Sequence, residues 1–308
     1  MIRKMARKGQ TQSKTLSVTL ALAFGLTAWG QTQGPLGYSV TTPRPISPAE
    51  GTTTPSAQAT QRHARVELIS QRLTIAPGEK SWLAVHFTLD PGWHIYWQNP
   101  GDSGQPPALK WQLPDGFTVG EIQWPRPERL RNGPLADYGY KDEATLLAAL
   151  QVPTRQEGLK VEIAADATWL VCREVCIPER DHLHVSLPVA RAPVVDPAQT
   201  RLFDEARKKL PLPWLDRWGA GVESLKDSFV LTLNAGSPVQ QVEFFPLQAS
   251  EIDNAAPQIL KTTPKGGQLT LKKSDQLMKP VPVLKGLLVV DGVAYRFQAR
   301  VVERKKSQ

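Results

Sequence analysis

The stretch SWLAVHF, residues 81–87, alternates between two sets of side chains, as a β-strand with two different faces does. One face would carry Leu83, Val85 and Phe87, and the opposite face would carry Trp82, Ala84 and His86. The stretch WHIYW, residues 93–97, has the same period of two and places its bulky apolar side chains, Trp93, Ile95 and Trp97, together. Both segments therefore predict strands with one buried face.

Further strand-like segments follow at residues 145–152, 159–171 and 182–189, separated by turns that contain proline or glycine. The chain has 27 prolines in 308 residues, or about 9% against a usual ~5%, which disfavours an all-helical fold. Short strands at this spacing predict an antiparallel β-sandwich.

A short helix is expected after the first sandwich. Asp196 can cap its N-terminus and Pro197 suits the first helical position, whereas Pro211 and Pro213 end it. The apolar side of this helix would consist of Leu202, Phe203, Ala206 and Leu210. We interpret this helix as a connector between two domains.

Alternation resumes from residue 222 and predicts a second, smaller β-sandwich. Its strands are expected at residues 229–233, 242–245, 268–271, 284–290 and 293–302. The last two flank Asp291 and Gly292, a two-residue turn typical of a β-hairpin because glycine accepts the positive φ that such turns require.

The N-terminal region predicts export. A basic segment from Arg3 to Lys14 precedes an apolar run at residues 16–28, and small residues at Ala28 and Gly30 indicate signal-peptide cleavage after Gly30. An uncleaved anchor is the alternative. Residues 31–61 are rich in Pro, Thr and Ser and predict a disordered tether. The expected division is therefore 1–30, 31–61, 62–192 for the first sandwich, 193–218 for the connector and 219–308 for the second.

The charge does not indicate nucleic-acid binding. The formal net charge is +8, but five cations lie in residues 1–30, which contain no acid, so the rest of the chain carries +3. After residue 30 the basic run is at residues 304–306, where a solvated tail is the simpler explanation. No glycine-rich phosphate loop or Ser-His-Asp order stands out, and we expect no cofactor.

The two cysteines of the chain, Cys172 and Cys176, are separated by three residues at the end of a predicted strand. In an exported protein such a pair should form a disulfide with itself, across a tight hairpin-like loop. The bridge could be structural, although chain entropy gives a loop this short only ~2 kcal/mol. It could equally be redox-active, because short exposed bridges are the reducible ones. Arg173 would favour a thiolate on its neighbour and Glu174 would oppose it.

A metal site is a further alternative for the same residues. Cys172, Cys176, His182 and His184 combine thiolates with imidazoles, a donor set that suits zinc or cuprous copper. The spacing departs from zinc-finger patterns, and thiols tend to oxidise in the periplasm. His182 and His184 could also be polar residues on a solvent-facing strand.

Two tyrosines lie outside the predicted strands and are further candidates for the site. Tyr138 and Tyr140 flank Gly139 among polar neighbours, which predicts a loop whose aromatic side chains cover or bind something. Packing against a sheet edge is the other interpretation.

Taken together, four motifs resemble the N-terminal periplasmic domain of DsbD-type thiol:disulfide interchange proteins, in the branch that includes ScsB. They are residues 92–104, GWHIYWQNPGDSG, residues 124–127, WPRP, the Tyr138–Gly139 pair, and residues 169–178, WLVCREVCIP. The similarity spans about residues 63–190, and residues 220–303 resemble the second module of that branch, with EFFP at 243–246 and LKGL at 284–287.

The resemblance implies an all-β protein of two immunoglobulin-like antiparallel β-sandwiches joined by a short helix. It implies a protein-disulfide reductase component in which Cys176 forms the mixed disulfide with partners and Cys172 resolves it, under a cap loop whose tyrosine corresponds to Tyr138. Tyr140 lies nearby, and Asp137 replaces an aromatic residue of the family pattern.

The resemblance also implies the partners: periplasmic thioredoxin-like or disulfide-isomerase-like proteins, in processes such as cytochrome c maturation or copper tolerance. Full-length relatives continue into membrane and thioredoxin-like domains. Since this sequence stops after the second sandwich, we expect a separate membrane electron-transfer protein as the donor.

Overall fold

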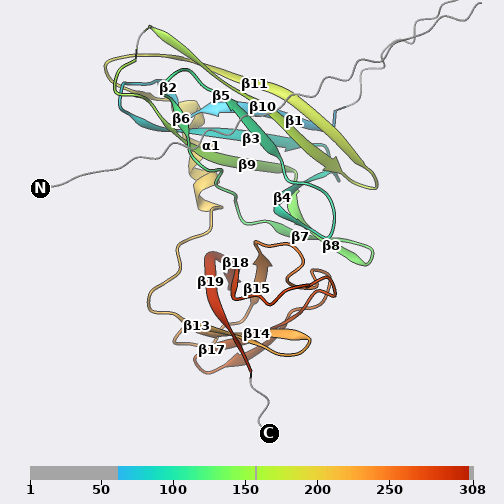
Figure 1. The fold of residues 1–308 in the computed structure, drawn as a ribbon. Helices are drawn as coiled ribbons and strands as arrows, with labels where there is room; N and C mark the ends of the chain where they lie inside the picture. Colours follow the sequence, from blue (N-terminus) through green and yellow to red (C-terminus); the bar gives the residue numbers. More distant parts are fainter. Residues whose placement is uncertain (1–61, 157, 305–308) are drawn as a thin grey trace, which may run out of the picture. The chain divides into compact units, whose positions relative to one another are not determined.

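A computed structural model describes residues 62–156 and 158–304 of the chain (Figure 1). The predicted signal peptide and tether, residues 1–61, lie outside the described residues. Within the described ranges, no helix combines the length and apolar character needed to cross a bilayer.

The first sandwich is built from two antiparallel sheets. One has the strand order β1-β3-β9-β6, formed by Ala64–Ser70, Lys80–Leu89, Glu143–Gln151 and Thr118–Val119. The other has the order β11-β10-β4-β8-β7, formed by Cys176–Pro188, Lys160–Cys172, His94–Gly101, Leu135–Lys141 and Glu128–Asn132, and β5 (Ala108–Gln112) also pairs with β10. A small sheet joins β2 (Arg72–Thr74) to β12 (Val194–Val195).

The alternating face predicted for residues 81–87 is confirmed, because Leu83, Val85 and Phe87 are all buried in the main core. The opposite face of β3 is not simply exposed. Ala84 is fully buried there, since the helix α1 (Pro197–Lys208) packs Phe203 against it.

The helix begins as the sequence predicts. The side chain of Asp196 accepts a hydrogen bond from the backbone N–H of Ala198, and Pro197 occupies the first turn. Its apolar side covers the outer face of the sheet that contains β3 and β9, so α1 is part of the first sandwich's packing as well as a connection.

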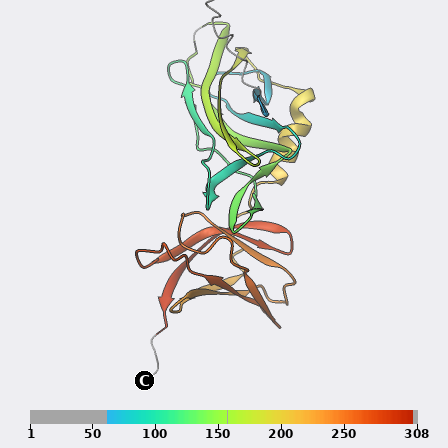
Figure 2. The same ribbon diagram turned by 90° about the vertical axis from the view of Figure 1, so that its right-hand side faces the viewer.

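The second sandwich contains seven paired strands in the order β15-β18-β19-β13-β14-β17-β16. These strands are Val242–Pro246, Val283–Val290, Val293–Glu303, Gly219–Ser224, Ser228–Asn234, Gly266–Lys272 and Ile259–Thr263. All pairs are antiparallel except β13 with β19, which run parallel. Figure 2 shows the red strands of this sandwich opposite the orange and brown ones. Its apolar core includes Leu231, Leu269 and Leu288.

The predicted hairpin at residues 291–292 is confirmed. Val290 pairs with Val293, and the two turn residues Asp291 and Gly292 have φ of 47° and 87°. Both values lie in the left-handed region, as a two-residue hairpin turn of this kind requires.

Aromatic and apolar side chains connect the two sandwiches. The ring of Phe245, from β15, lies 5.2 Å from the ring of Tyr138 and 6.4 Å from that of Trp97, both in the first sandwich. Leu287 and Val289 of β18 belong to the same apolar cluster.

The predicted all-β fold of two sandwiches is confirmed by this strand order, while the exact domain limits at residues 192 and 219 stay a prediction.

Candidate functional site

The cysteine pair closes the longest hairpin of the described chain. Strands β10 and β11 pair over their whole length, and Cys172 lies directly opposite Cys176 at the end of the ladder. Their sulfurs are bonded at 2.02 Å, and their Cα atoms are 4.2 Å apart. The backbone N–H of Arg173 donates to the carbonyl of Val175 across the loop, at 3.1 Å. The expected disulfide across a tight three-residue loop is thus present.

The two cysteines differ in exposure. Cys172 is only 2% exposed, and it pairs on its other side with His94 of β4. Cys176 is exposed, and the adjacent Val175 is 63% exposed. Because thiol–disulfide exchange requires an attacking sulfur to reach its target, access to this bond is through Cys176.

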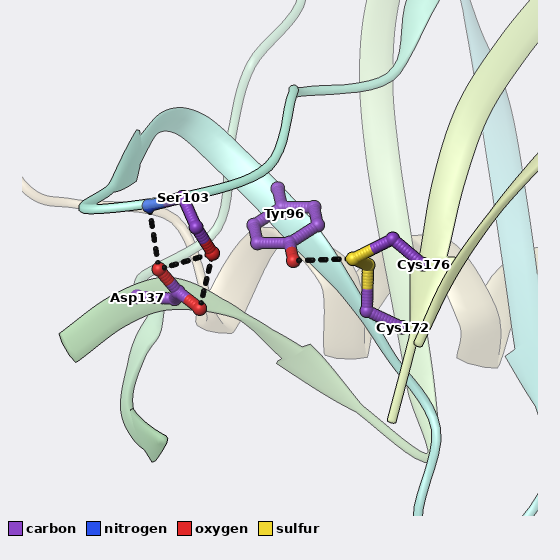
Figure 3. The surroundings of a disulfide bond; sticks show 5 residues. All are labelled: Tyr96, Ser103, Asp137, Cys172 and Cys176. Carbon is purple, nitrogen blue, oxygen red and sulfur yellow. Dashed lines mark hydrogen bonds between the residues drawn. A yellow bond between two sulfur atoms is a disulfide. The ribbon is translucent and has the colours of Figure 1, made fainter. Parts of the chain in front are cut away.

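Tyr96 contacts the exposed cysteine from inside the protein (Figure 3). Its hydroxyl oxygen lies 3.4 Å from the Sγ atom of Cys176. A disulfide sulfur carries no hydrogen, so the tyrosine hydroxyl is the donor in this contact. Burial raises the pKa of Tyr96 above its ordinary value, and the charge of Asp137 adds to this effect although Ser103 opposes it. The hydroxyl therefore keeps its proton at neutral pH.

A glycine-containing loop fixes the ring of Tyr96. Gly104 lies so close to it that an added Cβ would come within 2.1 Å of a ring carbon. The preceding Ser103 donates from its backbone N–H and its hydroxyl to the carboxylate of Asp137, at 2.8 and 2.9–3.0 Å. Figure 3 shows Tyr96 between this Ser103–Asp137 pair and the disulfide.

Two further titratable groups lie near the bond, Asp137, which is buried, and His94, which is half-buried. Burial raises the pKa of Asp137, against the hydrogen bonds from Ser103 and the charge of His94. Burial lowers the pKa of His94, whose ring packs edge-on against Tyr96 at 5.3 Å. At neutral pH the imidazole of His94 is therefore uncharged.

The predicted cap loop is wrong. Tyr138 and Tyr140 lie in strand β8, and both side chains are buried. Their hydroxyls donate to Asn254 and to the carbonyl of Pro125, not to the disulfide. The physical reason lies at Gly139. Here β8 pairs with β4 in the same sheet, and the strands are so close that a Cβ on Gly139 would be 2.1 Å from the carbonyl oxygen of Ile95.

Sequence reasoning missed Tyr96, although a signal was present. In residues 93–97 the period of two places Trp93, Ile95 and Trp97 in the core. It leaves His94 and Tyr96 together on the other face, where His94 is paired with Cys172 of β10 and Tyr96 contacts Cys176.

The four-residue metal site is also wrong. His182 is six residues from Cys176 along β11, which is roughly 20 Å in an extended strand, so these side chains cannot share one ion. His182 instead bonds Asp166 across the hairpin, with 2.8 Å between Nδ1 and Oδ1. Among the described residues, no group of three or more His, Cys, Asp or Glu side chains is arranged to hold a metal.

The charged residues of the loop have separate positions. The guanidinium of Arg173 lies over the ring of Trp93, 5.1 Å from its centroid, and His63 stacks on the same ring at 3.8 Å. Glu174 is exposed at the tip. The cation of the loop is thus held on an aromatic surface beside the disulfide.

Comparisons with known proteins show what the domain that carries this site is similar to. Residues 65–188 match the family described as "Thiol:disulfide interchange protein DsbD, N-terminal". The N-terminal periplasmic domain of ScsB from Proteus mirabilis is similar in structure, with a TM-score of 0.59 and 16% identity, covering 79% of this chain and 95% of that one. The Neisseria meningitidis DsbD N-terminal domain in the reduced form covers 39% of this chain and 89% of its own, with 14% identity and a TM-score of 0.25. A comparison with curated protein sequences gives no match.

Proposed function

We propose that the Cys172–Cys176 pair passes reducing equivalents to oxidised proteins of the bacterial periplasm, because residues 65–188 match the DsbD N-terminal family and contain this disulfide. The observation that carries the proposal is the asymmetry of the bond. One sulfur belongs to an exposed cysteine with a tyrosine donor beside it, and the other to a buried cysteine.

The exchange has two halves. A thiolate of a reduced donor attacks Sγ of Cys176, the Cys172–Cys176 bond breaks, and Cys172 leaves as a thiolate. The second thiol of the donor then attacks the donor's own sulfur in the mixed disulfide and releases Cys176. Two electrons have moved to the pair, and the donor is left as a disulfide.

In the second half, the Cys176 thiolate attacks a disulfide of the substrate protein and releases one substrate thiolate. Cys172, directly opposite in the hairpin, then attacks Cys176 Sγ and releases the second. The domain returns to its disulfide form, and the substrate leaves as a dithiol. Cys176 is thus the residue that meets partners, and Cys172 resolves the mixed species.

The partners follow from this chemistry. We propose thioredoxin-like or disulfide-isomerase-like periplasmic proteins as acceptors, since they present an accessible cysteine pair. A membrane electron-transfer protein is the expected donor. A signal peptide within residues 1–30 would deliver the chain to the periplasm, where the solved ScsB domain is described as residing.

The reduction potential of the full chain tests the proposal. We expect a value between about −120 and −270 mV, the range of catalytic pairs, from equilibration with a glutathione or dithiol buffer. A potential far below about −300 mV, typical of structural disulfides, would overturn it. The double variant Cys172→Ser/Cys176→Ser gives the baseline of the assay.

A further inference from the structure

One buried side chain of the second sandwich reaches the loop that covers Tyr96. Asn254, in the segment between β15 and β16, is 4% exposed. Its Oδ1 accepts a hydrogen bond from the hydroxyl of Tyr138 at 2.9 Å, and its Nδ2 donates to Oδ1 of Asp102 at 2.8 Å. Because the carboxylate of Asp102 can only accept, these two partners fix the orientation of the Asn254 amide.

Asp102 transmits this contact to the covering loop. Its second oxygen accepts from the backbone N–H of Ala136 at 2.8 Å, and its own N–H donates to the carbonyl of Ala136 at 3.2 Å. The next two residues are Ser103, bonded to Asp137, and Gly104, packed on the ring of Tyr96. A continuous set of contacts therefore leads from Asn254 to the hydroxyl beside Cys176.

We infer that Asn254 is a positioning residue for the redox site: by fixing the loop at Asp102, the second sandwich sets where the Tyr96 hydroxyl lies relative to Cys176. The inference rests on the proposed exchange at Cys176 for its significance. It gives the second sandwich a part in the chemistry of the first.

The physical consequence concerns the reduced state. A hydroxyl that donates to Sγ in the disulfide can donate to the thiolate that reduction leaves on the same atom. A hydrogen bond to the charged form lowers the pKa of the thiol and raises the thiolate fraction. Loosening the cover over Tyr96 would weaken that bond and reduce the reactivity of Cys176.

The test uses the full chain with Cys172→Ser, in which Cys176 is the one remaining cysteine. The rate of its alkylation by iodoacetamide as a function of pH gives the pKa of the thiol. We expect Tyr96→Phe to raise that pKa by about one unit, which is about tenfold in thiolate fraction below the pKa. Asn254→Ala should raise it in the same direction by a smaller amount.

Two further variants complete the test. Tyr138→Phe removes one of the two Asn254 bonds and should give a smaller shift than Asn254→Ala, and it replaces that variant if Asn254→Ala does not fold. Arg126→Gln removes a different hydrogen bond between the sandwiches, from its Nη1 to the carbonyl of Gly292, and should leave the pKa unchanged at physiological salt.

The inference is overturned if the folded Asn254 and Tyr138 variants both keep the parent pKa, or if Arg126→Gln shifts it equally. Alkylation needs no partner protein, so its outcome is separate from that of the reduction potential. If the reduction potential is that of a structural disulfide while the variants still shift the pKa of Cys176, the proposed function is contradicted and the positioning role of Asn254 is not.

Discussion

The two long hairpins of the molecule close in different ways. In the second sandwich, β18 and β19 are joined by Asp291 and Gly292, and no covalent bond closes the hairpin. In the first, β10 and β11 are longer, with 13 residues each, and yet a disulfide closes them. The hairpin with more backbone pairing carries the additional link, so the link is not needed to hold the strands together.

The side chains around the two hairpin ends also differ. Tyr96, Asp137 and His94, all with shifted pKa values, gather around the disulfide. The turn at residues 291–292 is exposed, and an added Cβ at Gly292 would meet no atom within 4 Å. The end of the β10–β11 hairpin is thus surrounded by titratable side chains with shifted pKa values, whereas the turn at residues 291–292 makes hydrogen bonds with Arg126, Gln240 and Gln241.

The largest expected effect is the difference between the two cysteines in trapping mixed disulfides. Cys172→Ser should trap mixed disulfides with partner proteins through the exposed Cys176, because the resolving thiol is missing. Cys176→Ser should trap few, since Cys172 is buried. Non-reducing gels of each variant after incubation with an oxidised thioredoxin-like protein measure the difference. Equal trapping by both variants would contradict the assigned roles.

A second prediction concerns what the bond contributes to folding. Cys172→Ser/Cys176→Ser should lower the free energy of unfolding by about 2 kcal/mol, the chain-entropy value for a loop this short. Urea denaturation of the variant, with the reduced parent as control, measures it. A loss of the folded state would show that the disulfide is structural after all, and that the hairpins differ less than we argue.

A third prediction uses a titratable group of the second sandwich, Glu251, which is 7% exposed. Burial raises its pKa to about 7, from an ordinary 4.5. The folded state therefore binds this proton more tightly than the unfolded chain, and the contribution to stability is complete below pH 4.5 and is lost as the pH rises through 7. Glu251→Gln should remove that loss and stabilise the protein by about 3 kcal/mol at pH 8.5 relative to its effect at pH 4.

Urea denaturation of parent and variant at the two pH values checks this. An unchanged pH dependence would mean that Glu251 is not protonated by burial. The potential of the disulfide should be the same in both proteins, because the described contacts of the redox site do not include this carboxyl.

The smallest expected effect concerns the other hairpin. Gly292→Ala should lower the free energy of unfolding by about 1 kcal/mol, since alanine is disfavoured at a φ of 87°. Gly221→Ala is the matched control, because Gly221 also has open space at its Cβ but lacks a positive φ. Neither variant should change the reduction potential. A loss for Gly292→Ala no greater than that for Gly221→Ala would mean that the turn does not depend on its glycine.

Much of the fold could be predicted from local patterns. The period of two identified the buried face at Leu83, Val85 and Phe87, and the cap at Asp196 identified the helix. The pairing of Cys172 with Cys176 also followed from spacing, since three residues suffice for a tight loop. The strand period could even have excluded the metal quartet, because six residues of strand separate His182 from Cys176.

The sequence by itself thus determined the buried face of β3, the turn at residues 291–292, the start of the helix and the disulfide, because these depend on backbone conformation and on neighbours a few residues away. Only the tertiary structure decided that Tyr96 and not Tyr138 contacts the sulfur, that Cys172 is buried, and that Asn254 reaches the same loop. Those contacts join residues 80 to 152 positions apart. They depend on the order in which strands pair across a sheet and on how two sandwiches pack, which no local period encodes.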